Sequence, residues 1–408
     1  MSFILNWVLL VVFSALGGIF FLNFLTVHPR RMSLFLLLTS LAVFALILLI
    51  LNSFHGNILF IAIPLALVTF LGGYLVTNAL FLSREDPRQV PILTRQPGDP
   101  GDGHTAVVYF THGEPQTYDP IGWINQFREF DKEHIPFVPF YARPFFIYNL
   151  RDHYLQVGMS EHRQGHLRMM KALEQEFRRA GDTTTRFYIC FLDDSPSANS
   201  AVIQALNAGA SHLIVSEVFL TISNHTAEGE ALIKKVDVEK YGATLKFTTP
   251  LWDSNTLMNM FVQRVNSHNG TGHKSEIGIL LVGHGQPDEW DTQWPTEIQQ
   301  EVSFRQNVLK LFEQDGYHPN NLSEAWIEFK KPRSDSVVKE FYRNGVKKIY
   351  FFAAAISADS IHSQYDIPSH IQKANLPPDV HAVNLGGWND DPIVIQAIKE
   401  KIDPLMTH

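Results

Sequence analysis

The sequence predicts two similar α/β domains, each a doubly wound, Rossmann-like parallel sheet, preceded by three transmembrane α-helices. Three observations support this prediction. Residues 1–82 are almost entirely apolar; beyond Thr105 short apolar runs alternate with amphipathic stretches; and a His-Gly-x-Pro turn occurs twice, each time directly after an apolar run. We therefore expect a membrane anchor (1–82), a linker (83–104), a first α/β domain (105–270) and a second α/β domain (271–408).

The composition excludes several classes of protein. The 408 residues carry a formal net charge of −8, whereas a general nucleic-acid binder needs a basic surface, so we expect no nucleic-acid partner. The single cysteine, Cys190, excludes a disulfide framework and an iron–sulfur cluster built from this chain alone.

The apolar N-terminal region contains three runs of suitable length to cross a membrane. About 20 helical residues span the roughly 30 Å of hydrocarbon in a bilayer. A cleaved signal peptide is the alternative for the first run, but no basic segment precedes it and two further runs follow closely. No Asp, Glu, Lys or Arg lies inside the runs, which indicates an anchor rather than an ion path. The three runs are Phe3–Val27, Ser33–Leu51 and Ile58–Leu82.

Basic residues predict the orientation of these spans. Arg30 and Arg31 lie between the first and second runs, and Arg84, Arg88 and Arg95 follow the third, whereas residues 52–57 contain no Lys or Arg. By the positive-inside rule, the N-terminus lies outside and the soluble domains face the cytoplasm. The lipid bilayer is thus an expected partner. Residues 83–104 are rich in Pro, Gly and charge, which is typical of a linker.

The soluble part alternates between predicted strands and predicted helices, which is typical of a parallel sheet covered on both faces. Ligands of such sheets bind beyond the carboxyl ends of the strands. The predicted strands are 106–110, 186–192, 212–220, 277–282, 325–329, 348–355 and 380–385. The predicted helices are 165–179, 197–207, 296–314, 336–343 and 391–402.

An internal repeat relates the two α/β domains. Residues 108–115 (VYFTHGEP) match residues 280–287 (LLVGHGQP), with the two histidines 172 positions apart, and a second pair of glycine-containing segments matches at an offset of 136. Two matches in the same order indicate duplication. The first domain then contains about 36 additional residues, and these include the aromatic stretch 137–148 (FVPFYARPFFIY).

Two histidine-bearing loops in each domain converge on the carboxyl ends of the strands. His112 and His284 occupy the repeated turns, and His362, flanked by Asp359 and Asp366, follows a later strand of the second domain. His225 has the corresponding place in the first domain. Neutral imidazoles bind divalent iron, cobalt, nickel and zinc and can accept a proton near neutral pH. The spacing matches neither a zinc finger nor an HExxH helix.

These segments resemble a known family. The turn at 280–287, the stretch Trp326–Pro332 (WIEFKKP), the loop with Asp359, His362 and Tyr365, and 385–392 (LGGWNDDP) follow in order the C-terminal half of ferrochelatases and of the related sirohydrochlorin cobaltochelatases. In the first half, residues 151–160 (RDHYLQVGMS) resemble a family segment that contacts the macrocycle. The resemblance covers roughly residues 105–405 and implies a chelatase-type fold.

The resemblance also implies roles for individual residues. His284 matches the metal-binding and proton-accepting histidine, and His362 occupies a place where ferrochelatases have glutamate and cobaltochelatases have histidine. His284 and His362 are therefore the expected catalytic residues, and they bind the metal together with Asp359. The second domain then holds the main metal site, while His112 and His225 are candidates for a second or vestigial site.

Further residues are candidates for binding the macrocycle. Aromatic rings of the insertion would stack on a flat ligand and its arginine would pair with a propionate, although such rings are also common in ordinary cores. The candidates are Phe140, Tyr141, Arg143, Phe145, Tyr154, Ser160 and Tyr365.

The resulting expectation is a membrane-anchored tetrapyrrole chelatase that inserts ferrous iron into a porphyrin. Co²⁺ or Ni²⁺ as the metal substrate with sirohydrochlorin is an alternative, as is a non-catalytic haem or metal carrier. A doubly wound hydrolase or transferase with His112 as its base is a further alternative, but the chain contains no Gly-x-Ser-x-Gly, Gly-x-Gly-x-x-Gly or phosphate-binding Gly-Lys-Ser/Thr motif. The sequence does not indicate an oligomeric state.

Overall fold

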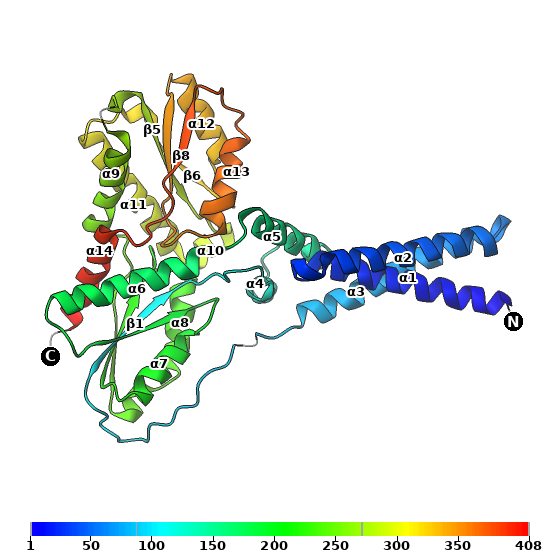
Figure 1. The fold of residues 1–408 in the computed structure, drawn as a ribbon, viewed down its shortest axis with the longest axis horizontal. Helices are drawn as coiled ribbons and strands as arrows, with labels where there is room; N and C mark the ends of the chain where they lie inside the picture. Colours follow the sequence, from blue (N-terminus) through cyan, green and yellow to red (C-terminus); the bar gives the residue numbers. More distant parts are fainter. Residues whose placement is uncertain (1, 87, 271, 407–408) are drawn as a thin grey trace. The chain divides into compact units, whose positions relative to one another are not determined.

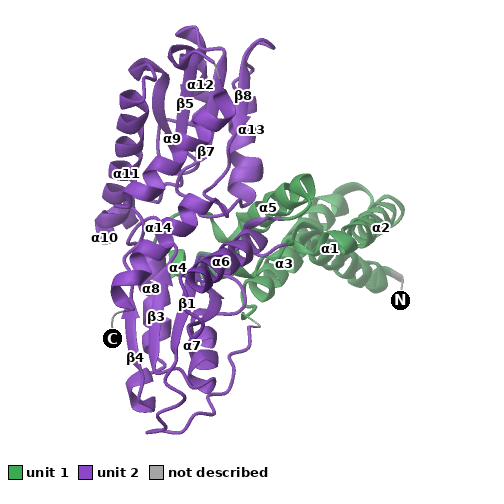
Figure 2. Ribbon diagram, turned by 60° about the vertical axis from the view of Figure 1, so that its left-hand side comes forward, with its two compact units in different colours: residues 1–87, 117–159 green, residues 88–116, 160–408 purple. Residues whose placement is uncertain are grey.

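A computed structural model describes residues 2–86, 88–270 and 272–406. The chain forms two compact units, which Figure 2 shows in different colours. The first contains residues 1–87 and 117–159, and the second contains residues 88–116 and 160–408. Residues 117–159, expected within the first α/β domain, thus group with the N-terminal helices.

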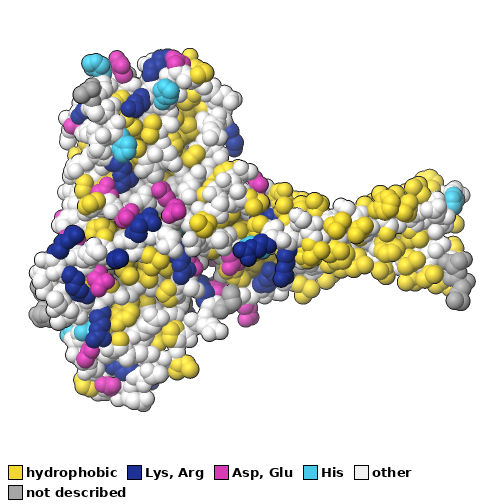
Figure 3. Space-filling view, viewed as in Figure 1, with side chains coloured by type: hydrophobic (Ala, Val, Ile, Leu, Met, Phe, Trp, Pro, Cys, Tyr) yellow, Lys and Arg dark blue, Asp and Glu magenta, His cyan; other side chains and the backbone are white. Residues whose placement is uncertain are grey.

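The first unit begins with three long apolar helices, α1 (Ser2–Thr26), α2 (Pro29–Ser53) and α3 (Leu59–Leu82), each long and apolar enough to cross a membrane. Glycine lets α1 and α3 pack closely. A Cβ atom at Gly18 would lie 2.0 Å from the Phe70 carbonyl oxygen, so no larger residue fits there. Hydrophobic side chains cover the visible surface of these helices (Figure 3).

The insertion of the first unit comprises α4 (Ile121–Lys132), the short 3₁₀ helix η2 (Phe140–Ala142) and α5 (Arg143–Val157). Its aromatic rings form a cluster, in which Phe146 contacts Trp123 and Phe127 with ring centroids 4.5 and 5.6 Å apart. The insertion also contacts α1, where Arg151 donates hydrogen bonds to the Phe24 and Val27 carbonyl oxygens at 2.6 and 3.0 Å. The aromatic stretch is therefore a helical packing element.

The second unit contains two parallel sheets of four strands each, with the orders β2-β1-β3-β4 and β6-β5-β7-β8. The identical order confirms the predicted pair of similar α/β domains. The first sheet consists of β1 (Thr105–Thr111), β2 (Arg186–Phe191), β3 (His212–Glu217) and β4 (Thr244–Phe247). The second consists of β5 (Ile277–Gly283), β6 (Leu322–Trp326), β7 (Lys348–Ala353) and β8 (His381–Asn384).

Helices cover both faces of each sheet, as Figure 1 shows for the second sheet with α9 and α11 on one side and α12 and α13 on the other. The helices of the first half are α6 (His162–Arg179), α7 (Ala198–Asn207), α8 (Asn224–Lys234) and α9 (Asn255–Asn269). Those of the second half are α10 (Asp288–Gln293), α11 (Pro295–Gln314), α12 (Ser334–Arg343), α13 (Ile367–Gln372) and α14 (Pro392–Ile402).

One hydrophobic core joins the two halves. Side chains from β1 and α6 pack in the same cluster as side chains from β5, α9, α11 and α14. The last helix of the first half, α9, packs on the second half, where Phe261 contacts Phe304 and Phe352. The last helix of the chain, α14, packs against α6 of the first half. The halves therefore form a single compact unit.

Most predicted strands agree with the structure, with two differences. The strand expected at 325–329 is β6 (Leu322–Trp326), and its last predicted residues already form the following loop. Strand β4 (Thr244–Phe247) was not predicted because it is a short edge strand with only partial burial. The predicted linker has no helix or strand after Ser83 in its described residues. The Thr94 and Arg95 backbone N–H groups donate to Asn207 Oδ1 at 2.8 and 3.2 Å and fix the linker to the first half.

Candidate active site

His284 and His112 follow the carboxyl ends of β5 and β1 in glycine turns of the same form. Gly285 and Gly113 have φ of +84° and +91°, a left-handed conformation, and a Cβ atom at Gly285 would lie 2.4 Å from the Glu328 carbonyl oxygen. In each turn the histidine Nδ1 lies within hydrogen-bond distance of the glycine carbonyl oxygen, at 2.7 Å for His284 and 2.9 Å for His112. A carbonyl only accepts, so Nδ1 is the donor in both turns, and in a neutral imidazole held this way the lone pair is on Nε2.

His362 faces His284 from the loop after β7. It opens a π-helical turn, His362–Asp366, and such turns often occur at functional sites. The ring centroids of His284 and His362 lie 5.1 Å apart with the planes at 82°. Burial together with the nearby His362 lowers the pKa of His284 to about 4, so His284 is a neutral imidazole near neutral pH.

His362 has a different electrostatic environment. Its Nδ1 lies 2.7 Å from the Asp366 carboxylate. Burial by itself would lower the pKa of His362, but the hydrogen bond and charge of Asp366, with the charges of Glu328 and Glu114, outweigh burial and raise it to about 9. The pair thus combines a neutral with a protonated imidazole.

The first half holds a corresponding pair. His112 and His225 have ring centroids 4.6 Å apart, and His112 Nε2 lies 3.5 Å from Asp193. His225 faces the Trp290 ring of the second half, at 6.2 Å. Burial, with contributions from His112 and His284, holds the pKa of His225 well below its ordinary value. The structure therefore brings the candidate histidines of both halves into one region at the strand ends.

Glu114 links the two halves beside these histidines. Its buried carboxylate accepts hydrogen bonds from the Ser160 hydroxyl and from the Ile361 backbone N–H, the latter at 3.1 Å. Burial raises the pKa of Glu114, and the Ser160 hydrogen bond and the charges of His362 and His112 partly oppose this. Glu114 thus connects the His112 turn to the residue that precedes His362.

Two further histidines lie buried behind the first-half pair. The His166 ring nitrogens lie 2.9 Å from the Tyr109 hydroxyl, 3.2 Å from the Thr111 hydroxyl and 3.1 Å from the Ser357 hydroxyl. The His162 ring lies 4.5 Å from that of His166. Burial lowers the pKa of His166 to about 3 and holds that of His162 well below its ordinary value.

A buried ion-pair network supports the His284 turn. The His284 backbone N–H donates to Glu301 at 3.1 Å, and Glu301 faces the fully buried Arg305 at 3.6 Å. Arg305 also faces Glu324 at 3.3 Å, and its guanidinium lies 3.9 Å from the Trp326 ring centroid. These charges fix the backbone from which the His284 imidazole projects.

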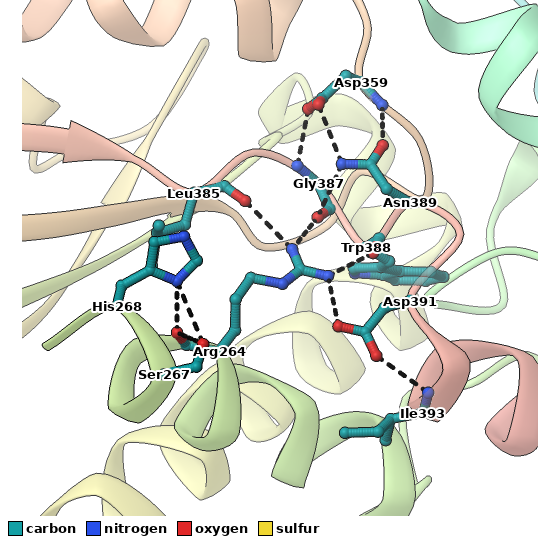
Figure 4. A network of polar contacts seen from close by, with 10 residues as sticks. All are labelled: Arg264, Ser267, His268, Asp359, Leu385, Gly387, Trp388, Asn389, Asp391 and Ile393. Atoms are coloured by element: carbon teal, nitrogen blue, oxygen red, sulfur yellow. Dashed lines mark hydrogen bonds and ion pairs between the residues drawn. The ribbon is translucent and has the colours of Figure 1, made fainter. Parts of the chain in front are cut away.

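Asp359, an expected metal ligand, binds the neighbouring loop in this structure (Figure 4). Its carboxylate accepts hydrogen bonds from Gly387 N–H and the Ser363 hydroxyl at 2.8 Å and from the Asn389 amide at 3.0 Å. Arg264 binds the same loop through the Gly387 carbonyl oxygen at 2.5 Å. The carboxylate that contacts His362 is thus Asp366 rather than Asp359.

Most of the expected macrocycle-binding residues lie in the first unit. Arg143 is buried and forms a two-pronged ion pair with Asp131. Tyr154 is buried beside Tyr118. Phe140, Tyr141 and Phe145 lie in η2 and at the start of α5. Ser160 binds Glu114, and Tyr365 lies on the π-helical turn of His362.

Sequence reasoning missed four residues of the site. Glu114 lies in the His112 turn, and a charged side chain between His-Gly and Pro could have indicated a functional residue. Glu301, Arg305 and His166 gave no signal, because single polar residues on amphipathic helices are typical of solvated faces. Within residues 2–86, 88–270 and 272–406, no group of three or more His, Cys, Asp or Glu side chains is arranged to hold a metal ion.

Comparisons with known proteins identify a family for most of the chain. The family model described as ferrochelatase matches residues 104–404. No curated protein sequence matches the chain. Among solved structures, SirB from Bacillus subtilis with Fe³⁺ has a TM-score of 0.47 at 13% identity and covers 74% of this chain and 95% of its own. CbiX, described as the terminal enzyme for siroheme biosynthesis in denitrifying bacteria, has a TM-score of 0.42 at 12% identity, with 74% and 100% covered.

Proposed function

Because the chain belongs to the ferrochelatase family, we propose that it is a tetrapyrrole metal chelatase that inserts ferrous iron into a porphyrin. The observation that carries the proposal is the facing pair His284 and His362, with ring centroids 5.1 Å apart at the carboxyl ends of β5 and β7. Metal ion and porphyrin are both substrates in this reaction.

Metal insertion requires a base and a place for the ion. Two pyrrole N–H protons leave the macrocycle as four ring nitrogens bind the metal, so each turnover releases two protons. His284 suits the first role, because its Nδ1–H is held by the Gly285 carbonyl oxygen and its Nε2 lone pair is available. The low pKa of His284, about 4, keeps that lone pair free near neutral pH.

His362 supplies the second nitrogen of the site. A metal ion that binds His362 through Nε2 displaces the proton from that nitrogen, because an imidazole nitrogen binds a metal only when it is deprotonated, while Nδ1–H stays bound to Asp366. Asp366 orients the ring through Nδ1, as carboxylates beside metal-binding histidines do. The other coordination positions of the ion would be taken by water and then by the pyrrole nitrogens.

We also propose that the three apolar helices anchor this enzyme in a membrane. Their length and composition support it. The arginines between the first two helices and after the third support an orientation with the N-terminus outside and the chelatase unit in the cytoplasm. Protease protection of an N-terminal tag in sealed vesicles tests the orientation.

The function is tested by anaerobic metal insertion with the full-length protein in detergent. Fe²⁺, Co²⁺ and Ni²⁺ are each offered with protoporphyrin, coproporphyrin and sirohydrochlorin, and absorbance follows the product. His284→Ala and His362→Ala are expected to lose turnover, whereas His381→Ala, an exposed histidine of the same half, retains it.

Other outcomes would change the assignment. Turnover only with sirohydrochlorin and Co²⁺ or Ni²⁺ would favour the alternative function, a sirohydrochlorin chelatase, which the histidine at position 362 also resembles. Tight binding of tetrapyrrole without insertion for every pair would leave a carrier on a chelatase fold and contradict the enzymatic proposal.

A further inference from the structure

Three aromatic side chains of the insertion are exposed, in contrast to the packed aromatic cluster of the same insertion. Phe140 is 42% exposed, Tyr141 62% and Phe145 47%. In contrast, Phe127 and Phe130 of α4 are buried. Three large exposed aromatic side chains thus lie within six residues of one another, and exposed apolar groups that gather on a surface mark binding sites. We refer to these three side chains as the aromatic edge.

Polar groups of α3 hold the aromatic edge against the apolar helices. The Tyr74 hydroxyl donates to the Tyr141 carbonyl oxygen at 2.7 Å, and the Asn78 amide donates to the Phe140 carbonyl oxygen at 2.8 Å. Tyr74 and Asn78 are both buried and lie one turn apart. These two groups satisfy backbone carbonyl oxygens of η2, so the position of the turn along α3 is fixed.

This position lies near the edge of the hydrocarbon layer. At 1.5 Å per residue, Asn78 and Tyr74 lie about 6 and 12 Å before the end of α3 at Leu82. A helix of 24 residues is about 36 Å long and exceeds a 30 Å hydrocarbon core by about 3 Å at each end. In a span centred on the bilayer, Asn78 and Tyr74 therefore lie about 3 and 9 Å inside the hydrocarbon boundary, so the turn that they hold is in the outer third of the hydrocarbon layer.

Arginines of the insertion mark the headgroup level. Arg128 donates to the Leu82 carbonyl oxygen at 2.9 Å, and Arg151 donates to the Phe24 and Val27 carbonyl oxygens at the end of α1. Both cations satisfy carbonyl groups at helix C-termini, which favour positive charge. Arginine caps at the helix ends, with aromatic side chains one to two turns deeper, reproduce the order of groups across a membrane interface.

The aromatic edge also packs on the apolar helices themselves. The Phe145 ring contacts Phe21 of α1 and Tyr74 of α3, with centroids 6.2 and 6.4 Å apart. We propose that Phe140, Tyr141 and Phe145 bind the bilayer itself, in the interfacial layer beside α1 and α3. The insertion is then a fourth membrane-contacting element, and this inference depends on the proposed anchoring of α1–α3.

The proposal is tested by the depth of single labels in the full-length protein. The one cysteine, Cys190, is buried and is replaced by alanine. Tyr141→Cys and Phe145→Cys then carry an environment-sensitive fluorophore in phosphatidylcholine nanodiscs. Tyr141→Cys leaves intact the carbonyl oxygen that binds Tyr74. Quenching is measured with doxyl-labelled lipid and with aqueous iodide.

Two reference positions make the outcome decisive. Leu67→Cys lies mid-span on α3 and is 65% exposed, and Gln156→Cys is an exposed polar position on α5. We expect labels at 141 and 145 to be quenched by doxyl lipid as at 67 and to resist iodide, whereas the label at 156 responds to iodide.

Iodide quenching at 141 and 145 equal to that at 156 would overturn the inference while leaving the anchor intact. Shielding from both quenchers would also overturn it, because a second protein copy or a tetrapyrrole would then cover the edge. Iodide access at 67 would overturn the anchoring proposal itself.

Discussion

The two halves of the second unit place the same residue types at the same strand ends but surround them differently. His112 and His284 share one turn geometry, and His225 and His362 follow the corresponding strands β3 and β7. Asp366 raises the pKa of His362 to about 9, whereas burial lowers that of His225. A duplicated framework thus fixes where a side chain lies, and its neighbours decide its charge.

The support behind the two turns differs in the same way. His166 of α6, a neutral histidine, lies behind the end of β1, while Arg305 of α11, a buried cation, lies behind the end of β5. Arg305 holds Glu301, which in turn binds the backbone of His284. In the second half, buried charged groups therefore hold the backbone of the histidine turn. We expect this half to carry the chemistry.

The largest expected effect separates the two histidine pairs. His284→Ala and His362→Ala should each lower kcat/KM for metal insertion by about 10²–10⁴-fold, the usual contribution of a positioned acid or base. His112→Ala and His225→Ala should each cost less than about tenfold, a barrier change below about 1.4 kcal/mol. Equal losses in all four variants would show one shared site and break the comparison.

The second prediction concerns the buried network behind β5. Arg305→Met leaves Glu301 buried without its cation, and breaking a buried ion pair costs about 3–5 kcal/mol. We expect a matching loss in the free energy of unfolding, measured by denaturant titration in detergent. Lys401→Met, which removes an exposed ion pair with Asp253, is the matched control and should change stability by under about 1 kcal/mol. Similar effects for the two variants would contradict the assigned role of Arg305.

Asp366→Asn tests what makes His362 different from His225. Without the carboxylate, burial dominates, so the pKa of His362 should fall from about 9 to below its ordinary value. Histidine NMR titration measures the shift, and the pH profile of metal insertion should change in parallel. Asp193→Asn, beside His112 at 3.5 Å, serves as the control and should leave His362 unchanged. A His362 pKa that stays near 9 would rule out Asp366 as its cause.

The smallest expected effect is the acid sensitivity that His166 confers. Its pKa is about 3 in the folded protein and 6.5 in the unfolded chain, so the unfolded state binds the proton first as the pH falls. The stability is complete above pH 6.5 and is lost below it, by about 1.4 kcal/mol per pH unit. Between pH 7.5 and 5, His166→Gln should show a shallower fall in Tm than the parent protein or the exposed variant His318→Gln. An unchanged slope would contradict the buried neutral state.

The sequence by itself determined the local features of this protein. Uninterrupted apolar runs predict three long helices, because a membrane span is a matter of length and polarity. The alternation of strands and helices predicts parallel sheets, and the repeated His-Gly turn predicts which strand ends carry imidazoles. Each of these depends on residues close together in the chain.

Only the tertiary structure decided which distant groups meet. In the structure the aromatic insertion contacts α1 and α3, Arg143 pairs with Asp131, and Asp359 binds the Gly387 loop. Arg305 also lies behind His284. A side chain can form many alternative pairs of similar energy, and the choice among them depends on burial and on partners far along the chain, which no local pattern records.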